Sequence, residues 1–157
     1  MPSTELVPYT VTGVEEVLQM LRTAPRTVVA ISFARALKAG ATVIEEVLVA
    51  HIPMRELRVG GDADEPSLIE ALGADITLDA DFRGGQAEIG FGKQGYVANF
   101  VEYGHRLIGH KPALKQLGAV QPHPFMRPAA EVSADAAIEA FGDTLVATLK
   151  QDGLVDG

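Results

Sequence analysis

The string from Gly90 to Gly95 is the first stretch of the sequence whose residue types and spacing have a known chemical use. It matches G-x-G-x-x-G, in which glycines let backbone amides approach a pyrophosphate at the start of a helix. That use also requires a βαβ unit and an acidic residue about 20 positions further on to bind a ribose hydroxyl. Lys115 stands near that distance instead. We therefore favour a strand-to-helix turn that needs a positive φ.

Three of the four histidines, His105, His110 and His123, lie close together in the sequence, and Glu102 is near them. Imidazole and carboxylate groups are ligands for zinc or iron. No two of these residues have the i, i+4 spacing that fixes two ligands on one helix, and the segment is rich in Gly and Pro. Histidines in solvent or at an interface are the simpler interpretation. His51, near a predicted helix end, is interpreted as a partly buried or capping side chain.

Nucleophilic and acid–base chemistry have little support in the sequence. The chain has no Cys, which excludes a thiolate nucleophile, a disulfide and a Cys-based metal site. No serine lies in a G-x-S-x-G elbow. Ser32 falls within a predicted helix, while Ser67 and Ser133 fall near predicted helix starts, where a hydroxyl caps the helix. An acid–base pair of carboxylates would need burial, and the acids on one face of a predicted strand suit a solvated surface: Asp75, Asp79 and Asp81. We expect neither catalysis nor a bound cofactor or metal.

We predict one globular domain over residues 1–157, with a folded core over 13–152. Hydrophobic residues make up 47% of the 157 residues and charged residues 22%, which disfavours disorder. The 13 basic and 21 acidic side chains give a net charge of −8. That balance disfavours general binding to nucleic acid and electrostatic docking to an anionic membrane. No apolar run is expected to approach the roughly 18 residues of a membrane span, and the N-terminal residues lack the pattern of a signal peptide.

Hydrophobic periodicity predicts two helices in the first third of the chain. A short helix is expected over Val14–Arg22, and a second from Arg26 to about His51, where Pro53 stops it. Residues 53–66 combine charges with glycines and are predicted to form a mobile loop. The apolar stripe of the second helix has these members: Phe33, Leu37, Gly40, Ile44 and Val47.

The middle of the chain predicts a short helix and then a β-hairpin. Residues Ser67–Leu72 favour a helical turn. Asp75–Phe82 and Gln86–Phe91 both alternate polar and apolar residues, as half-buried strands do, and Gly84-Gly85 forms the turn between them. The sequence therefore indicates an antiparallel hairpin with one face in water.

The last third predicts a short helix, a loop and a long helix. Tyr96–Tyr103 is expected to be helical and to present Val97, Phe100 and Val101, and residues 105–123 are expected to be an extended loop. Pro128 is predicted to start the last helix, which runs to about Gln151 with Gly153 as its cap. The predicted inner face of that helix is Val132, Ile138, Phe141, Leu145 and Leu149. The expected class is α+β: a long N-terminal helix, an antiparallel hairpin or small sheet, a short helix and a long C-terminal helix.

A two-part string is the most distinctive feature of the sequence: YVANFVEYG at 96–104 and QPHPFMRPA at 121–129. It resembles the tail-component family of long-tailed phages (siphoviruses). Members of that family typically carry Y-A-x-x-V-E-x-G-T, then a loop, then h-P-F-h-R-P-A leading into a long terminal helix. Here His105 replaces the usual Thr, and the family's P-V-x-T-G-x-L after the first long helix is degraded over Pro53–Gly61. The matching positions are Tyr96, Val101, Glu102, Gly104, Pro124, Phe125, Arg127, Pro128 and Ala129.

The resemblance implies a structural virion protein of a tailed phage, prophage or phage-like particle. Members of the family act as neck, head–tail joining or tail-completion proteins. The implied assembly is a homo-oligomeric ring between the head connector and the tail tube. Its implied partners are portal or head-completion (connector) proteins and tail terminator or tail tube proteins. DNA passes through the ring without specific binding, and the acidic balance suits such a conduit.

The resemblance implies that the protein is not an enzyme, and the residues and charge balance predict no cofactor and no membrane contact. It is located in the neck or tail of the virion after synthesis in the bacterial host cytoplasm. The alternative is a small metal- or nucleotide-dependent bacterial enzyme that uses Gly90–Gly95 or the loop histidines. A general α+β interaction module is a third hypothesis.

Within the two-part string, the large and charged residues suggest anchoring roles. Phe125 either fills this domain's own core or inserts into a neighbouring subunit, and we expect the core role. Arg127 carries a fork-shaped donor for a carboxylate, for which Glu102 is a candidate. The full set of expected interface or structural anchors is Glu102, Tyr103, Gly104, Pro124, Phe125, Arg127 and Pro128.

Overall fold

The computed structural model describes residues 22–53, 67–81, 84–108 and 116–154. All but the last residue of the predicted helix 14–22, and nearly all of the predicted mobile loop 53–66, lie outside the described residues. The described part is a mostly helical α+β structure, as the sequence predicts. Its elements are α2 (Arg26–His51), α3 (Leu68–Ala71), β1 (Gly73–Leu78), β2 (Gly85–Gly90), η2 (Gly92–Gln94), α4 (Gly95–Tyr103), β3 (His105–Ile108), β4 (Gln116–Val120) and α5 (Met126–Gln151).

Helix α2 is a single helix of 26 residues whose limits follow from two prolines. Pro25 precedes the first turn, and its carbonyl accepts hydrogen bonds from Val28 and Val29 at 3.0 and 3.2 Å. Pro53 follows the last turn. The predicted bounds of this helix are confirmed. By length and composition α2 could also cross a membrane, although charged residues interrupt its apolar sequence. One face of α2 packs against α5 in the described structure, and burial there is a second reason for an apolar composition.

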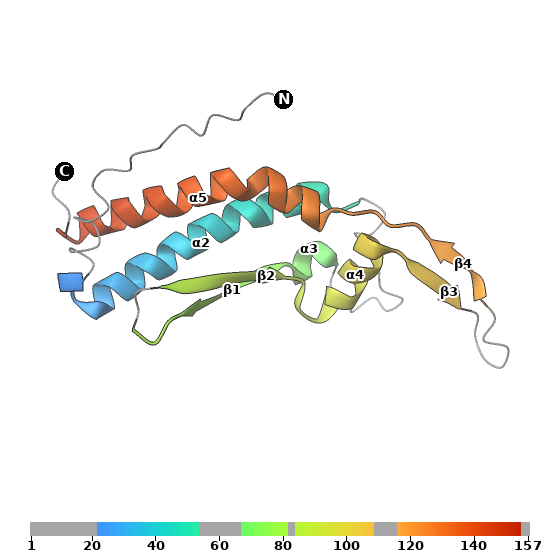
Figure 1. The fold of residues 1–157 in the computed structure, drawn as a ribbon, viewed down its shortest axis with the longest axis horizontal. Helices are drawn as coiled ribbons and strands as arrows, with labels where there is room; N and C mark the ends of the chain where they lie inside the picture. Colours follow the sequence, from blue (N-terminus) through green and yellow to red (C-terminus); the bar gives the residue numbers. More distant parts are fainter. Residues whose placement is uncertain (1–21, 54–66, 82–83, 109–115, 155–157) are drawn as a thin grey trace, which may run out of the picture.

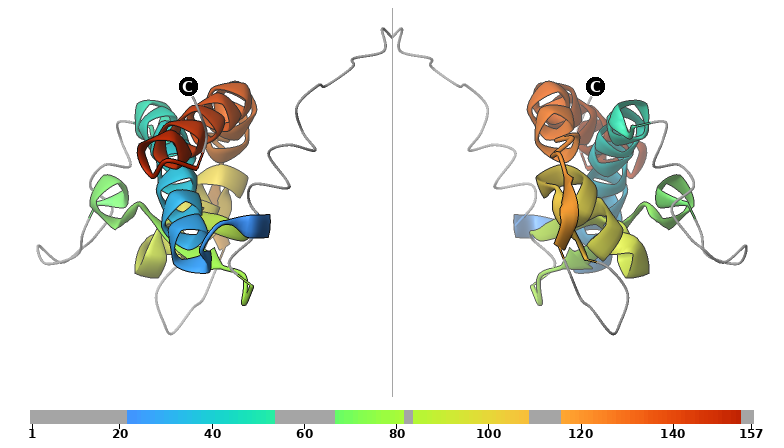
Figure 2. Two further views of the ribbon diagram at one scale, coloured as in Figure 1. Left: turned by 90° about the vertical axis from the view of Figure 1, so that its left-hand side faces the viewer. Right: turned by 90° about the vertical axis from the view of Figure 1, so that its right-hand side faces the viewer.

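The two long helices pack side by side and run in opposite directions (Figure 1). Small residues occupy their contact. A Cβ placed on Gly40 of α2 would lie only 3.0 Å from the backbone carbonyl oxygen of Ala137 on α5. Towards the start of α2, Phe33 and Phe141 meet edge to face with ring centroids 6.0 Å apart. The end views of Figure 2 show the same pair of helices beside each other.

The close approach of α2 and α5 corrects the predicted inner face of α5. Val132 and Ile138, both expected inside, are each 69% exposed. Leu149 is buried as predicted, and Phe141 and Leu145 are half-buried. Where two helix backbones lie close together, only small side chains fit between them, and the Ala137 carbonyl oxygen lies next to Gly40. The buried residues in the first half of α5 are all small: Ala129, Ser133 and Ala137.

Both ends of α5 have identifiable capping features. The helix begins at Met126 rather than Pro128, and Pro128 lies in its first turn, where a missing N–H leaves no hydrogen bond unmade. At the other end Gly153 has φ +70° and donates to the Lys150 carbonyl, while Leu154 donates to that of Leu149. This pair of hydrogen bonds is a Schellman cap, so the predicted capping role of Gly153 is confirmed.

Strands β1 and β2 form the predicted antiparallel hairpin, which packs against α2 and lies below it in Figure 1. Asp75 pairs with Glu88 on the wet face, and Ile76 pairs with Ala87 on the half-buried face. The first strand ends at Leu78, earlier than predicted, so Asp79 and Asp81 lie beyond it and are exposed. Only one of the three predicted face-sharing acids therefore lies in the strand.

Two predicted serine caps have different outcomes. Ser67 caps α3 as predicted, because its hydroxyl accepts the Glu70 N–H while the Glu70 carboxylate accepts the Ser67 N–H. Ser133 does not cap α5, because it lies two turns inside the helix. Its hydroxyl donates to the Ala129 carbonyl at 2.7 Å instead.

Residues 105–123, predicted to be an extended loop, contain a second antiparallel hairpin. Its strands β3 and β4 pair His105 with Val120 and Leu107 with Gly118. The β-branched residues Ile108 and Val120 favour extended backbone, and Pro122 and Pro124 lie outside the strands, where no ladder N–H is needed. Figure 1 shows this hairpin projecting beyond α4, away from the long helices. We call the described residues of β3 and β4 the arm.

Candidate functional site

Glu102 on α4 joins the two halves of the sequence motif. Its side chain is only 5% exposed. One carboxylate oxygen, Oε2, accepts hydrogen bonds from the backbone N–H groups of Phe125 at 2.7 Å and Met126 at 2.9 Å. These donors are the N-cap residue and the first residue of α5, where backbone N–H groups have no partner inside the helix. The negative charge of the carboxylate also interacts favourably with the positive end of the helix dipole.

Helix α4 positions Glu102 because one side of it is buried. Val97, Ala98, Val101 and Glu102 are its buried residues, spaced as neighbouring positions on one helix face. Three of these are apolar and belong to the hydrophobic core cluster. The core therefore fixes the rotation of α4, and that rotation aims the carboxylate at the start of α5.

Phe125 fills the core beneath this junction. It is 2% exposed and meets Phe91 edge to face with ring centroids 5.8 Å apart. Leu48 and Ile52 of the α2 end and Leu68 of α3 belong to the same cluster. Phe125 therefore packs in the core of its own chain, as expected.

Gly104 lets the chain turn from α4 into the arm. Its φ of +71° and ψ of 170° fall in a region that only glycine adopts readily. A Cβ at this position would lie 2.5 Å from the carbonyl oxygen of Val120. Just after β4, the His123 N–H donates to the Val101 carbonyl at 2.8 Å. Both ends of the arm are thus tied to the end of α4.

The remaining predicted anchors do not converge in the same way. Tyr103, Pro124 and Arg127 are exposed, and Pro128 is half-buried. The proposed ion pair between Arg127 and Glu102 is not present in the described structure. Arg127 reaches Glu102 only through its backbone N–H, at 3.5 Å from Oε1. The physical reason is that the backbone amides of the helix start occupy the carboxylate, which leaves the guanidinium on the surface.

An exposed aromatic strip on α4, which we define as Tyr96, Phe100 and Tyr103, was not predicted as a surface. Tyr96 and Phe100 meet edge to face with centroids 6.1 Å apart, and Phe100 lies 4.9 Å from the ring of His105. Of the three residues that this helix was expected to present, Val97 and Val101 are buried, whereas Phe100 is on the exposed side of α4. The i, i+4, i+7 spacing of the three aromatic residues was the signal that could have identified the strip.

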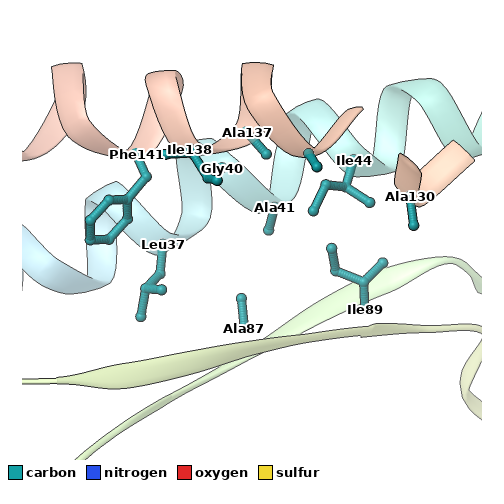
Figure 3. Close-up of a pocket in the computed structure, with 11 residues that line it drawn as sticks. Leu37, Gly40, Ala41, Ile44, Ala87, Ile89, Ala130, Ala137, Ile138 and Phe141 are labelled. Atoms are coloured by element: carbon teal, nitrogen blue, oxygen red, sulfur yellow. The ribbon is translucent and has the colours of Figure 1, made fainter. Parts of the chain in front are cut away.

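An apolar groove of about 410 Å³ lies between α2, α5 and β2 (Figure 3). Leu37 and Ile44 enter it from α2, Ile89 from β2, and Ala134 and Ile138 from α5. Every side chain that lines it is apolar. Sequence reasoning missed this groove because the alanines that leave the space open favour no particular face of a helix.

The candidate metal and nucleotide residues are placed apart from one another. His110 lies outside the described residues, His123 is exposed, and His105 stacks on Phe100 with its Nδ1 buried and without a partner. His51 is exposed and contacts the Val47 carbonyl through Nδ1 at 2.8 Å. Within residues 22–53, 67–81, 84–108 and 116–154, no three His, Asp or Glu side chains gather to form a metal site.

The Gly90–Gly95 string forms the end of β2, η2 and the start of α4. Gly92 has φ +46°, which fits the predicted strand-to-helix turn. Phe91 within it contributes to the core. The string thus has a structural use in joining the hairpin to α4.

Comparison of the chain with protein-family models, curated protein sequences and solved structures finds no match in any of the three.

Proposed function

We propose that this chain is a non-enzymatic structural subunit of the virion of a tailed phage, prophage or phage-like particle. Copies form a ring in the neck between the head connector and the tail tube, where they join head to tail or complete the tail. The partners are further copies of the chain, portal or head-completion proteins, and tail terminator or tail tube proteins. DNA passes through the ring without specific binding.

The observation that carries this proposal is the contact between the two halves of the phage-like motif. Glu102, in the first half, accepts the backbone N–H groups of Phe125 and Met126, in the second. Phe125 is buried directly beneath. The residues that carry the resemblance thus act as one structural unit, which supports reading the two strings as a single motif rather than as two chance matches.

The surface of the described residues also supports assembly. Five of the exposed large hydrophobic residues fall within α4 and β3: Tyr96, Phe100, Tyr103, Leu107 and Ile108. Contiguous exposed apolar surface on a folded protein marks a contact with another macromolecule. A subunit of a ring needs such surfaces, whereas an enzyme needs a pocket with convergent polar groups.

The proposal is tested in the phage or prophage that encodes the chain. Inactivating the gene should leave filled heads and finished tails that do not join, and supplying the wild-type gene in trans should restore whole particles. Negative-stain microscopy of the concentrated purified protein should show closed rings. Complete, infectious particles made without the gene would contradict the proposal.

The enzyme alternative gives a different result in the same preparation. A strictly monomeric protein, purified without a metal-affinity tag, that carries stoichiometric zinc or iron or binds a nucleotide would favour the alternative. Elemental analysis and nucleotide titration measure these two quantities directly.

A further inference from the structure

We propose that the arm of one copy docks into the apolar groove between α2, α5 and β2 of the next copy, so that copies join head to tail. The inference rests on the proposed function, because it names the contact that builds the ring. Four observations support it: the lining of the groove, the exposure of the arm, the distribution of charge and the direction in which the arm points.

The groove suits apolar side chains rather than a polar small molecule. Ligand sites combine an apolar wall with a few polar groups that fix the orientation of the ligand. This groove has the volume of such a site, about 410 Å³, but none of the described residues that line it has a polar side chain. Ile138 at its edge is 69% exposed, so the apolar surface continues outward from the groove onto α5.

The arm presents apolar side chains that its own body leaves uncovered. Leu107 is 43% exposed and Ile108 is 62% exposed. Figure 1 shows the arm pointing away from the long helices, so it cannot reach the groove of its own chain. An unfilled apolar groove and an uncovered apolar arm therefore occur together on one chain but can meet only between two copies.

Charge favours the same pairing. The sequence from Gly104 to Pro124 contains three basic residues, Arg106, Lys111 and Lys115, and no Asp or Glu. The rest of the chain then has 10 basic and 21 acidic side chains, a net charge of −11. Beside the groove, Glu131 and Asp135 are exposed on α5 within one turn of Ala134 and Ile138. Arg106, exposed on β3, has the complementary sign.

Docking of this kind joins two different surfaces and is heterologous. Each copy then keeps one free arm and one free groove, so addition continues until the copies close into a ring or extend as a filament. A contact between identical surfaces would stop at a dimer. The arm-and-groove contact therefore provides the type of symmetry that a neck ring needs.

Engineered thiols test the contact, because the chain has no Cys of its own. Ile108→Cys protein is mixed with Ala134→Cys protein under mild oxidation, and the rate of disulfide-linked dimer formation is measured. Docking predicts a rate about 100-fold or more above random collision at micromolar protein, because docked thiols have a millimolar effective concentration. Val146→Cys is the matched control for Ala134→Cys, since Val146 is exposed on α5 but does not line the groove.

A second pair of variants tests whether the contact drives assembly. Ile108→Asp should abolish self-association measured by sedimentation, while Val146→Asp should leave it unchanged. Circular dichroism should show both proteins folded, because both positions are exposed.

The outcomes separate the inference from the proposed function. Rings that form without a preferential Ile108–Ala134 cross-link would overturn the docking contact and leave the ring intact. A preferential cross-link in a protein that is dispensable for joining heads to tails would uphold the contact and overturn the proposed function. Two further results would overturn the inference. One is that the protein binds duplex DNA, that Arg106→Glu abolishes this binding, and that no preferential cross-link forms. The other is that the purified protein releases a lipid that had occupied the groove.

Discussion

The Glu102 carboxylate lies 2.7 Å from the backbone nitrogen of Phe125, so a buried acid on α4 holds the first turn of α5. The two residues are 23 positions apart in the sequence, and the whole arm lies between them. Phe125 contributes its side chain to the core and its N–H to the acid. Packing and helix capping therefore reinforce each other at one residue.

Removing the Glu102 carboxylate should destabilise the protein more than replacing Arg127 by lysine. Glu102→Ala leaves buried N–H groups without an acceptor and should lower the free energy of unfolding by about 1.5–3 kcal/mol, the range for hydrogen bonds to charged groups. Glu102→Gln keeps one acceptor oxygen and should cost less. Arg127→Lys should change the free energy of unfolding by no more than about 0.5 kcal/mol, because the guanidinium is exposed. Urea unfolding checks all three, and an Arg127→Lys cost equal to that of Glu102→Ala would contradict this assignment.

Two phenylalanines in neighbouring elements should respond in opposite ways to truncation. Phe125→Ala removes a fully buried ring and should destabilise the monomer by about 3–5 kcal/mol. Phe100→Ala removes a ring on the exposed side of α4 and should cost no more than about 0.5–1 kcal/mol. Thermal unfolding at low protein concentration measures both. A Phe125→Ala monomer with unchanged stability that fails only in assembly would show that Phe125 acts in a neighbouring subunit.

Replacing each of two helical glycines by alanine should change the stability of the protein in opposite directions. A Cβ placed on Gly142 of α5 would meet only open space, so Gly142→Ala should stabilise the protein by about 0.5–1 kcal/mol through helix propensity alone. Gly40→Ala would press a methyl group against the Ala137 carbonyl oxygen, a backbone atom that cannot rotate away. Overpacking costs about 1–3 kcal/mol, so a net loss is expected. Thermal unfolding compares the two variants, and equal stabilisation by both changes would show that α2 and α5 separate freely.

The cap of α3 should be visible in a titration. Hydrogen bonds from the Ser67 N–H, and then from its hydroxyl, hold the pKa of Glu70 below its ordinary value of 4.5. A carboxylate with a lowered folded pKa contributes stability above its unfolded pKa, and this contribution is lost as the pH falls through the folded value. Ser67→Ala should therefore raise the pKa of Glu70, measured by NMR. Ser133→Ala, in a distant helix, should leave it unchanged.

The sequence predicted those elements whose ends depend on local chemistry. Pro53 follows the end of α2, Ser67 caps α3 and Gly153 caps α5, as expected. The inner face of α5 was wrong because hydrophobicity predicts which side chains prefer burial, not how closely two helices approach. Because Gly40 allows the backbones to approach closely, small residues such as Ala137 and Ser133 are buried on α5, whereas Val132 and Ile138 are exposed.

The candidate site was only partly predictable for a related reason. The motif placed Glu102 and Phe125 in one set, but the atoms that meet depend on the angle between α4 and α5. That angle directs the carboxylate to backbone amides instead of the Arg127 guanidinium. The groove depends on three elements far apart in the sequence, so no local pattern could reveal it.

Gly104 has a consequence for how this protein can diverge. The direction of the arm is set at its base, by a glycine-only backbone conformation and by the His123 to Val101 hydrogen bond. The exposed residues of β3 contribute little to that geometry. Mutations at Leu107 or Ile108 can therefore change which surface the arm recognises while its orientation stays fixed, so binding specificity can evolve separately from folding.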